Sequence, residues 1–201
     1  MWRIPSEPGI FSAVRLGART RKLEGETVEL RRHARANYGL YAAWYGDPEI
    51  WHLTSWAPHP LSRSAVERLF EDRELSPVDD SFAIHVKGAD EPVGVISLMN
   101  ISEANESAEL SVIVGHPDDR HQGYGTEAIE LLLRYGFEEL GLNRVGLSAF
   151  EFNDEAIAAY EKLGFAVEGR YRQAIKRNSR FYDAILMSII KGEWQARAAS
   201  S

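Results

Sequence analysis

A glycine-containing segment, residues 120–126, carries the residue types that hold a phosphate group. It reads Arg120, His121, Gln122, Gly123, Tyr124, Gly125 and Thr126. Apolar residues recur at spacings of three and four from Gly125 onward, which predicts a helix there. The first amide N–H groups of a helix lack partners within it, and the dipole is positive at that end. Because glycine lets a backbone approach a bulky anion and Arg120 can add a charge-assisted contact, the segment is predicted to bind a pyrophosphate.

A second segment, residues 153–164, presents a phenol that could deliver a proton. Its apolar residues recur at helical spacing, and Asn153 or Asp154 can cap the helix. Tyr160 lies one turn before Gly164, which is typical of a helix end. A core tyrosine whose hydroxyl finds a partner is the commoner fate of such a residue. The order and spacing of the two segments favour a chemical role for Tyr160.

Other interpretations of the first segment fit the sequence less well or stay open. A tight turn before an ordinary core helix needs the same glycines. A Walker loop would need Lys-Ser or Lys-Thr after the second glycine, where Thr126 and Glu127 stand. The dinucleotide fingerprint needs an acidic residue about twenty positions on, where Leu147 falls. Neither phosphate motif is convincing.

Together, the two segments resemble the signatures of the GCN5-related N-acetyltransferase (GNAT) family. The signature Gln/Arg-x-x-Gly-x-Gly/Ala is matched by Arg120, Gly123 and Gly125. The other signature helix is matched by Asn153, Ala156, Tyr160, Gly164 and Phe165. The resemblance covers roughly residues 24–191 and is strongest over 108–190. Within the family the sequence is similar to RimJ/RimL-type enzymes, with some likeness to spermidine acetyltransferases.

This resemblance implies that the chain binds acetyl-CoA. The backbone of Val112, Ile113 and Val114 would pair with the pantetheine arm, and one of these N–H groups would polarise the thioester carbonyl. Amides of residues 122–126 would hold the pyrophosphate, and Asn153 would position the pantetheine. The implied cofactor residues are Val112, Ile113, Val114, Arg120, His121, Gln122, Gly123, Tyr124, Gly125, Thr126, Asn153 and Tyr160. Tyr160 would protonate the leaving thiolate.

An acetyl transfer to an amine also needs a base. An alkyl amine has a pKa near 10 and an α-amine one near 8, so both are largely protonated at neutral pH. Glu109 is a polar residue in the apolar strand expected over residues 108–114, and alternation places it on one face with Ser111 and Ile113. The family often has a base carboxylate on this strand, so Glu109 is predicted as catalytic base and acceptor contact. The alternative is a solvent-facing or salt-bridged glutamate, and burial is the deciding test.

The acceptor site is expected around residues 41–52, where family members vary. Trp44, Tyr45 and Trp51 could enclose an alkyl chain or a cation, and of these Trp44 and Trp51 are predicted to contact the substrate. Aromatic residues at helical spacing are more often core. The histidines are scattered without metal-ligand spacing, so no metal site is predicted.

The elements that must position these residues follow in a recognisable order. Strands are expected over 27–31, 82–86, 92–99, 108–114, 143–149, 167–172 and 180–189. Helices are expected over 34–45, from Ser62 or Ser64 to about 73, from Gly125 to 140, and after Asn153. This order suits an α/β (α+β) fold with a mixed sheet covered by helices on both faces. The resemblance implies a mostly antiparallel sheet with a splayed strand pair around the cofactor.

Composition is consistent with one globular domain of 201 residues. We expect an N-terminal arm over 1–23, an N-acetyltransferase domain over 24–191 and a frayed or oligomer-contacting tail over 192–201. The net charge of −7 argues against nucleic acid and suits a cationic acceptor. No run of about eighteen apolar residues and no signal-peptide core occur, which predicts no membrane partner and a cytoplasmic protein, monomer or homodimer.

The sequence therefore predicts an acetyl-CoA-dependent N-acetyltransferase that acts by direct attack in a ternary complex. Serine remains available for an acyl-enzyme although cysteine is absent, but no Gly-x-Ser-x-Gly elbow or comparable triad signature occurs. The acceptor is a primary amine of small-amine, polyamine or amino-sugar type. Two alternatives stay open: a RimJ/RimL-type enzyme for protein N-terminal α-amines, and a non-catalytic acyl-CoA-binding module.

Overall fold

A computed structural model describes residues 22–199 of the chain. The strands are β1 (Lys22–Glu24), β2 (Val28–Arg31), β3 (Asp80–Val86), β4 (Pro92–Ser102), β5 (Ser107–Val114), β6 (Arg144–Phe150), β7 (Ala166–Arg177) and β8 (Arg180–Ile190). The helices are α2 (Tyr38–Gly46), α3 (Pro48–Thr54), α4 (Arg63–Leu75), α5 (Tyr124–Arg134), α6 (Asp154–Lys162) and α7 (Lys191–Ala198). Short helical turns are η1 (Arg35–Asn37), η2 (Pro117–Asp119) and the π-helical η3 (Tyr135–Glu139).

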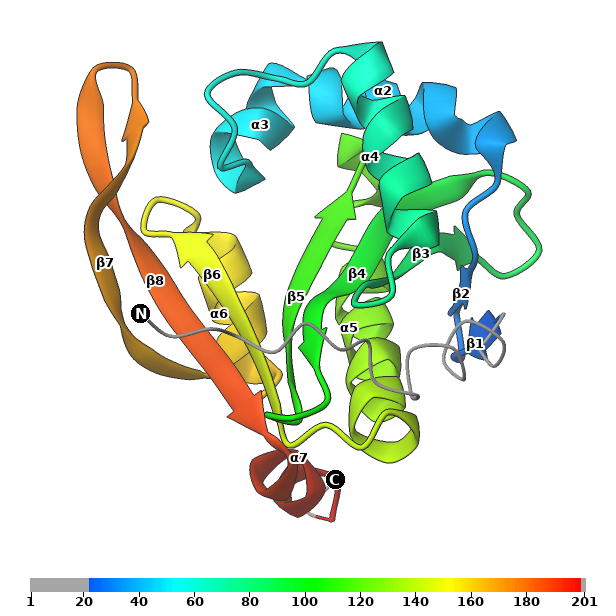
Figure 1. Ribbon diagram of the computed structural model, residues 1–201, viewed down its shortest axis with the longest axis vertical. Helices are drawn as coiled ribbons and strands as arrows, with labels where there is room; N and C mark the ends of the chain where they lie inside the picture. Colours follow the sequence, from blue (N-terminus) through cyan, green and yellow to red (C-terminus); the bar gives the residue numbers. More distant parts are fainter. Residues whose placement is uncertain (1–21, 200–201) are drawn as a thin grey trace, which may run out of the picture.

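One eight-stranded sheet organises the molecule in the order β1-β2-β3-β4-β5-β6-β8-β7. Its neighbouring strands run antiparallel, except that β5 and β6 run parallel. That parallel pairing is short, because it joins only residues 107–109 to residues 144–146. Beyond it the two strands diverge and open a V in the middle of the sheet (Figure 1). The predicted mixed, mostly antiparallel sheet with a splayed strand pair is confirmed.

Two hydrophobic clusters fill opposite faces of the sheet. On one face, α5 and α6 pack over apolar side chains of β2 to β6, including Leu98 and Leu110 (Figure 1). On the other face, α2 and α4 pack through Tyr41 and Phe70 against Val95 of β4 (Figure 1). Alternation along a strand sends successive side chains to opposite faces, so a single strand serves both clusters. The helices therefore flank the V from both sides.

The structure adds one helix, α3, that the sequence analysis missed. Asp47 caps it by accepting hydrogen bonds from the amides of Glu49 and Ile50, at 2.7 and 3.0 Å. Pro48 occupies the first helical position, where its missing N–H costs nothing. The Asp47-Pro48 pair was the available signal, but the helix is too short to show a clear apolar period.

Two boundaries also differ from the sequence analysis. The helix expected from Gly125 to residue 140 leaves α geometry after Arg134 and continues as the π-helical η3. The strand expected over 143–149 runs from Arg144 to Phe150, where a turn leads into α6. Neither change moves a predicted site residue off its element.

The C-terminal tail is a helix rather than a frayed segment. Trp194 of α7 packs on Phe137, with ring centroids 5.4 Å apart, and adds to the large core cluster. Arg197 donates to the carbonyl of Leu163 and to Glu130, both at 3.1 Å. These contacts correct the expectation that the tail is frayed. Most of the expected N-terminal arm lies outside the described residues, and residues 22–23 belong to β1.

Candidate functional site

A cavity of about 270 Å³ lies between β5, α5 and α6, on one side of the V. The predicted cofactor residues that line it are Val112, Ile113, Val114, Arg120, His121, Gly123, Tyr124, Gly125, Thr126, Asn153 and Tyr160. The exception is Gln122, whose side-chain amide reaches the carbonyl of Asp118 at 3.5 Å. Two segments separated by about thirty residues in sequence thus meet around one space, as the resemblance implies.

The start of α5 has the geometry of an anion cradle. Gly123 caps the helix with φ of +84°, a conformation that favours glycine, and a Cβ there would meet nothing within 4 Å. At Gly125, a Cβ would lie 3.2 Å from the Val114 side chain, so glycine lets the helix approach β5. The amides that begin α5 have no intrahelical partner, and residues 123–126 line the cavity. The cradle is accessible and carries a favourable dipole.

An Arg–Glu ion pair and a His–Glu contact join the cradle to neighbouring helices. Arg120 donates to Glu49 of α3 at 2.6 Å and to the carbonyl of Gly115 at 3.4 Å. His121, with φ of +60°, places its Nδ1 2.9 Å from Glu155 of α6, and both side chains are largely exposed. Sequence reasoning missed Glu49, because its partner is 71 residues away. Arg120 is therefore held at the cavity rim by α3.

Trp44 lies beneath the loop that precedes the cradle. Its side chain is only 6% exposed, and a Cβ on Gly115 would come within 2.0 Å of its ring. The ring packs with Tyr41, centroids 5.5 Å apart, in the cluster under α2. This position corrects the prediction that Trp44 encloses the acceptor: the ring supports the loop from inside the core.

Asn153 and Tyr160 project from α6 at the junction of two cavities. The Asn153 carbonyl oxygen accepts from the amide of Ala156 at 3.3 Å, and its side-chain NH₂ donates to the carbonyl of Leu53 at 3.3 Å. Asn153 therefore caps α6 and fixes the end of α3. Burial raises the pKa of Tyr160 to about 12. Within residues 22–199 the Tyr160 hydroxyl makes no hydrogen bond, so it keeps its proton and can donate it.

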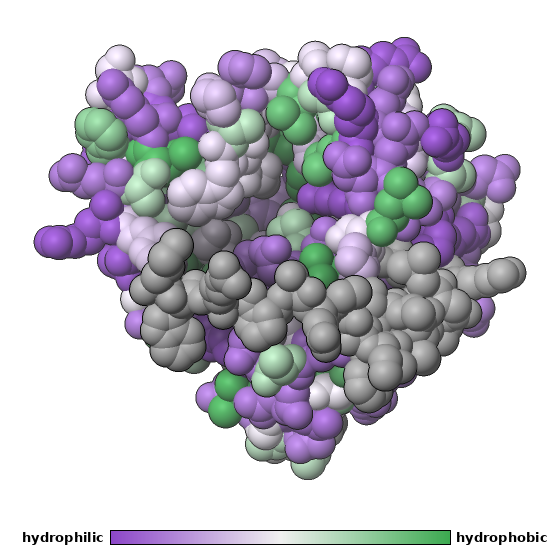
Figure 2. Space-filling view, viewed as in Figure 1, coloured by the Kyte–Doolittle hydropathy of each residue, from purple (hydrophilic) through white to green (hydrophobic). Residues whose placement is uncertain are grey.

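A second cavity of about 170 Å³ continues from the first into the V. The two share Val112, Asn153 and Tyr160 in their linings. Glu109 and Ser111 of β5 complete the second cavity, which faces the hollow in the upper part of Figure 2. Glu109 is solvent-exposed, so the burial test favours the solvent-facing interpretation. Glu109 nevertheless belongs to the site, because it lines the same cavity as Tyr160. We call this space the reaction cavity.

A third cavity, of about 250 Å³, extends from the reaction cavity toward α2 and α4. Trp51, the other predicted acceptor residue, lines it together with Tyr45 and Trp56. The Trp51 indole donates to the carbonyl of Ala57 at 2.9 Å, which fixes the plane of its ring. We call this space the aromatic cavity.

Arg177 of β7 connects the β7–β8 hairpin to the end of α3. Its guanidinium lies 4.1 Å from the centre of the Trp51 ring and donates to the carbonyls of Ser55 and, at 3.4 Å, Trp51. Burial lowers the pKa of Arg177, and its Nε is buried without a hydrogen-bond partner. Sequence reasoning missed Arg177 because it is more than 120 residues from its partners.

Comparison with known proteins agrees with this geometry. Residues 27–166 match the model of the family described as the acetyltransferase (GNAT) domain. The chain belongs to the GNAT acetyltransferase family. The resemblance inferred from the sequence is thereby confirmed, and the RimJ/RimL-type assignment within the family stays a prediction.

Relatives of this GNAT chain include enzymes named for polyamines. An uncharacterized N-acetyltransferase, p20, of Bacillus licheniformis is 27% identical over 172 residues, 84% of this chain and 96% of that protein. The spermidine N(1)-acetyltransferase of Escherichia coli K12 is 33% identical over 106 residues, 53% of this chain and 56% of that protein. The structure of spermidine N-acetyltransferase from Vibrio cholerae in complex with CoA and spermine has a TM-score of 0.77 at 23% identity, covering 85% of this chain and 99% of that one. That last likeness shows that the two chains share a fold.

This GNAT chain is thus an N-acetyltransferase that uses acetyl-CoA. The first cavity fits that molecule, because its cradle is open and β5 has no β6 partner beyond Glu109 among the described residues. The amides at the start of α5 would hold the pyrophosphate, and the free edge of β5 would hold the pantetheine arm.

Two features are absent from residues 22–199. No helix in that range has the length and apolar character needed to cross a membrane. Within the same range, His, Asp and Glu side chains form no group that could hold a metal ion.

Proposed function

We propose that the chain moves an acetyl group from acetyl-CoA directly to a small primary amine in a ternary complex. The observation that carries this proposal is the reaction cavity, where Glu109 and Tyr160 line one space of about 170 Å³. Bound acetyl-CoA supplies an acetyl thioester, so the C–N bond to the amine forms as the C–S bond breaks. The residues of the cavity position the amine, take one proton from its ammonium form, and pass to the departing sulfur the proton that the nitrogen loses after attack.

Tyr160 is the proposed acid. Its raised pKa keeps the phenol protonated across the physiological range, so the hydroxyl can donate to the departing sulfur. The ring leans on Phe165, with centroids 5.8 Å apart, and the amide of Phe165 donates to the Tyr160 carbonyl at 3.0 Å. These contacts at the end of α6 fix the direction of the phenol.

Glu109 is the proposed base. Its carboxylate takes a proton from the ammonium form of the acceptor, directly or through a water molecule. It lies on β5 at the last residue paired with β6, where the V begins to open. Among the described residues its hydrogen-bond donor is the side-chain amide of Asn100, at a long 3.4 Å, which leaves the carboxylate oxygens available.

Direct transfer suits the reaction cavity better than an acyl-enzyme route. Ser111 is the hydroxyl-bearing residue of β5 in its lining, and the described lining contains no histidine that could activate it. The remaining polar groups there are suited to binding and proton transfer.

The test is free-thiol release from acetyl-CoA with a panel of amines. The panel contains small amines, amino acids, polyamines, aminoglycosides and short peptides with different N-terminal residues. Release with a small amine supports the proposal. Release with peptides alone would favour the RimJ/RimL-type alternative instead. Binding of acetyl-CoA by calorimetry with no thiol release from any amine would overturn the proposal in favour of a binding module.

A further inference from the structure

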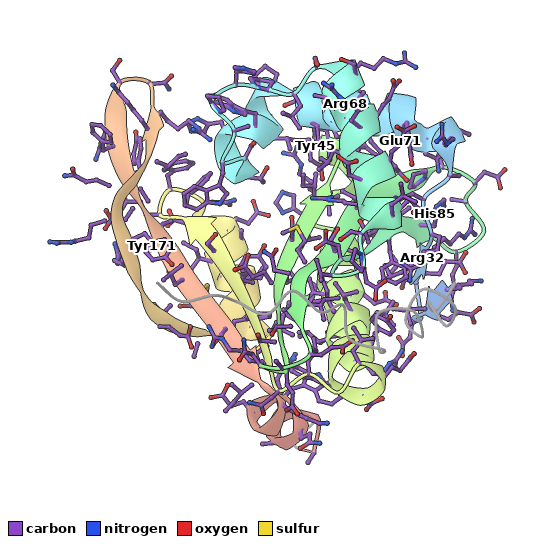
Figure 3. The ribbon with its side chains drawn as sticks, viewed as in Figure 1. Arg32, Tyr45, Arg68, Glu71, His85 and Tyr171 are labelled. Carbon is purple, nitrogen blue, oxygen red and sulfur yellow. The ribbon has the colours of Figure 1, made fainter. Side chains whose placement is uncertain are left out.

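The aromatic cavity contains one charged residue among its described lining, Arg73. Arg73 lies in the last turn of α4 and is partly buried. The rings of Tyr45, Trp51 and Trp56 form most of the surrounding surface. Figure 3 labels Tyr45, which lies in the region between α3 and α4. A cation at the end of a small aromatic pocket requires an explanation, because burying a charge is costly unless it is paired.

The contacts of Arg73 leave most of its donors unused. One terminal nitrogen reaches the Tyr45 hydroxyl at a long 3.4 Å, and the other reaches the Met99 sulfur, a weak acceptor, at 3.6 Å. The guanidinium also lies 5.5 Å from the centre of the Phe70 ring. A guanidinium carries five N–H donors. No carboxylate pairs with Arg73 within residues 22–199.

The ion pairs formed by α4 residues do not include Arg73. Arg63 is paired with Glu67 at 3.0 Å, one turn along the same helix. Glu71 is paired with Arg35, also at 3.0 Å, and so is not directed at Arg73. The negative end of the α4 dipole favours a cation at this position, but it takes up no side-chain N–H donor. The fork of Arg73 remains free to bind an oxyanion.

The aromatic cavity opens into the reaction cavity. Trp56, Met99 and Ser111 belong to both linings, as does Thr54 of α3. A molecule whose amine lies in the reaction cavity can therefore extend its apolar part between the tryptophans. Its far end would then meet Arg73.

We propose that Arg73 determines acceptor specificity and that the acceptor is a small primary amine with a carboxylate at the opposite end of an apolar chain, an ω-amino acid. The guanidinium fork matches a carboxylate in two-point geometry, and the aromatic rings enclose the apolar part. A polyamine would instead bring a second ammonium group toward an unpaired cation. This inference rests on the proposed function and separates the chain from the relatives named for spermidine.

The test compares amino acids with the amines that differ only by the carboxylate. 6-Aminohexanoate is paired with hexylamine and 5-aminopentanoate with pentylamine, and spermidine serves as a third ligand class. Binding is measured by calorimetry on the full chain saturated with CoA, so that no turnover is needed. Wild-type protein is expected to bind the amino acid about 10-fold or more tightly than its amine, in line with a charge-assisted pair.

The matched variants are Arg73→Met and Arg68→Met on the same helix. Arg68 is exposed and labelled on α4 in Figure 3, so it controls for loss of one positive charge. Arg73→Met is expected to lose the preference for the amino acid and to leave amine binding within about 2-fold, while Arg68→Met keeps the preference. Arg73→Lys, which keeps the charge without the fork, serves if Arg73→Met does not fold.

The outcomes separate this inference from the proposed function. Equal or tighter binding of spermidine or of the amines that lack a carboxylate by wild type would overturn the inference, as would a preference that survives in Arg73→Met. Thiol release from those amines would then still support the proposed function. Conversely, Arg73-dependent binding of amino acids without any thiol release would support the role of Arg73 in specificity and refute the proposed acetyl transfer.

Discussion

Tyr160 combines a raised pKa with a hydroxyl that has no competing partner among the described residues. Replacing Tyr160 with Phe keeps the ring and removes the proton donor. We expect kcat to fall by about 100-fold, because general acid catalysis contributes on that scale, while the KM for acetyl-CoA changes little. Steady-state kinetics by thiol release measure both quantities. A kcat within about 3-fold of wild type would show that water protonates the sulfur instead.

Glu109 makes a different prediction, because removing its carboxylate removes the proposed proton acceptor. Glu109→Gln keeps the size of the side chain, so we expect kcat/KM for the amine to fall by about 10-fold or more while acetyl-CoA binding is unchanged. Thiol release with one amine and calorimetry with acetyl-CoA measure the two effects. A kcat/KM within about 3-fold of wild type would exclude Glu109 as the base.

At the scale of elements, the loop between β5 and α5 depends on close packing of Gly115 on Trp44. Gly115→Ala would place a Cβ within 2.0 Å of a buried ring, so we expect a loss of about 1–3 kcal/mol in the free energy of unfolding. The cradle should also shift, which weakens acetyl-CoA binding. Gly192→Ala is the control, because a Cβ there meets nothing within 4 Å and alanine favours a helix. Urea unfolding and calorimetry measure the two effects, and equal stability of the two variants would contradict the packing argument.

Much of this scaffold could be predicted because short sequence motifs and the family resemblance indicate the same elements. The glycines at the start of α5 and the Asn153 cap of α6 are local features, and the family resemblance placed both against one strand. Trp44 was assigned wrongly because its spacing suits a core as well as a binding site. Arg73 and Arg177 were missed for a different reason. Arg73 is notable because no carboxylate pairs with it among the described residues, and Arg177 because its partners are far away in sequence.

At the scale of the whole molecule, His33 links stability to pH. Its ring nitrogens lie 3.1 Å from the Tyr41 hydroxyl and 2.8 Å from the Ser81 hydroxyl. Desolvation, followed by the charges of Arg73 and Arg32, lowers the pKa of His33 to about 3. The folded protein therefore keeps His33 neutral in mild acid, whereas the unfolded chain takes up the proton near pH 6.5.

The sign of the effect follows from proton binding. Between about pH 6.5 and pH 3 the unfolded chain binds more protons at this site, so stability falls as the pH falls. The slope from this one group is at most about 1.4 kcal/mol per pH unit. We expect His33→Gln, which retains a donor and an acceptor, to lack this contribution. Urea unfolding from pH 4 to 7.5 compares the two slopes, and identical slopes would refute the assignment.

The three residue pairs that join β5 to β6 have a consequence for the backbone itself. Past Glu109, β5 is an edge strand located inside a sheet, with one row of N–H and C=O groups directed at the V. Edge strands readily accept another extended chain, and here α3 and α6 leave room for a narrow one. Amide hydrogen exchange would report that occupancy. The N–H groups of β5 that face β4 would stay protected throughout, while those that face the V would exchange fast in the free protein and slow when the gap is filled.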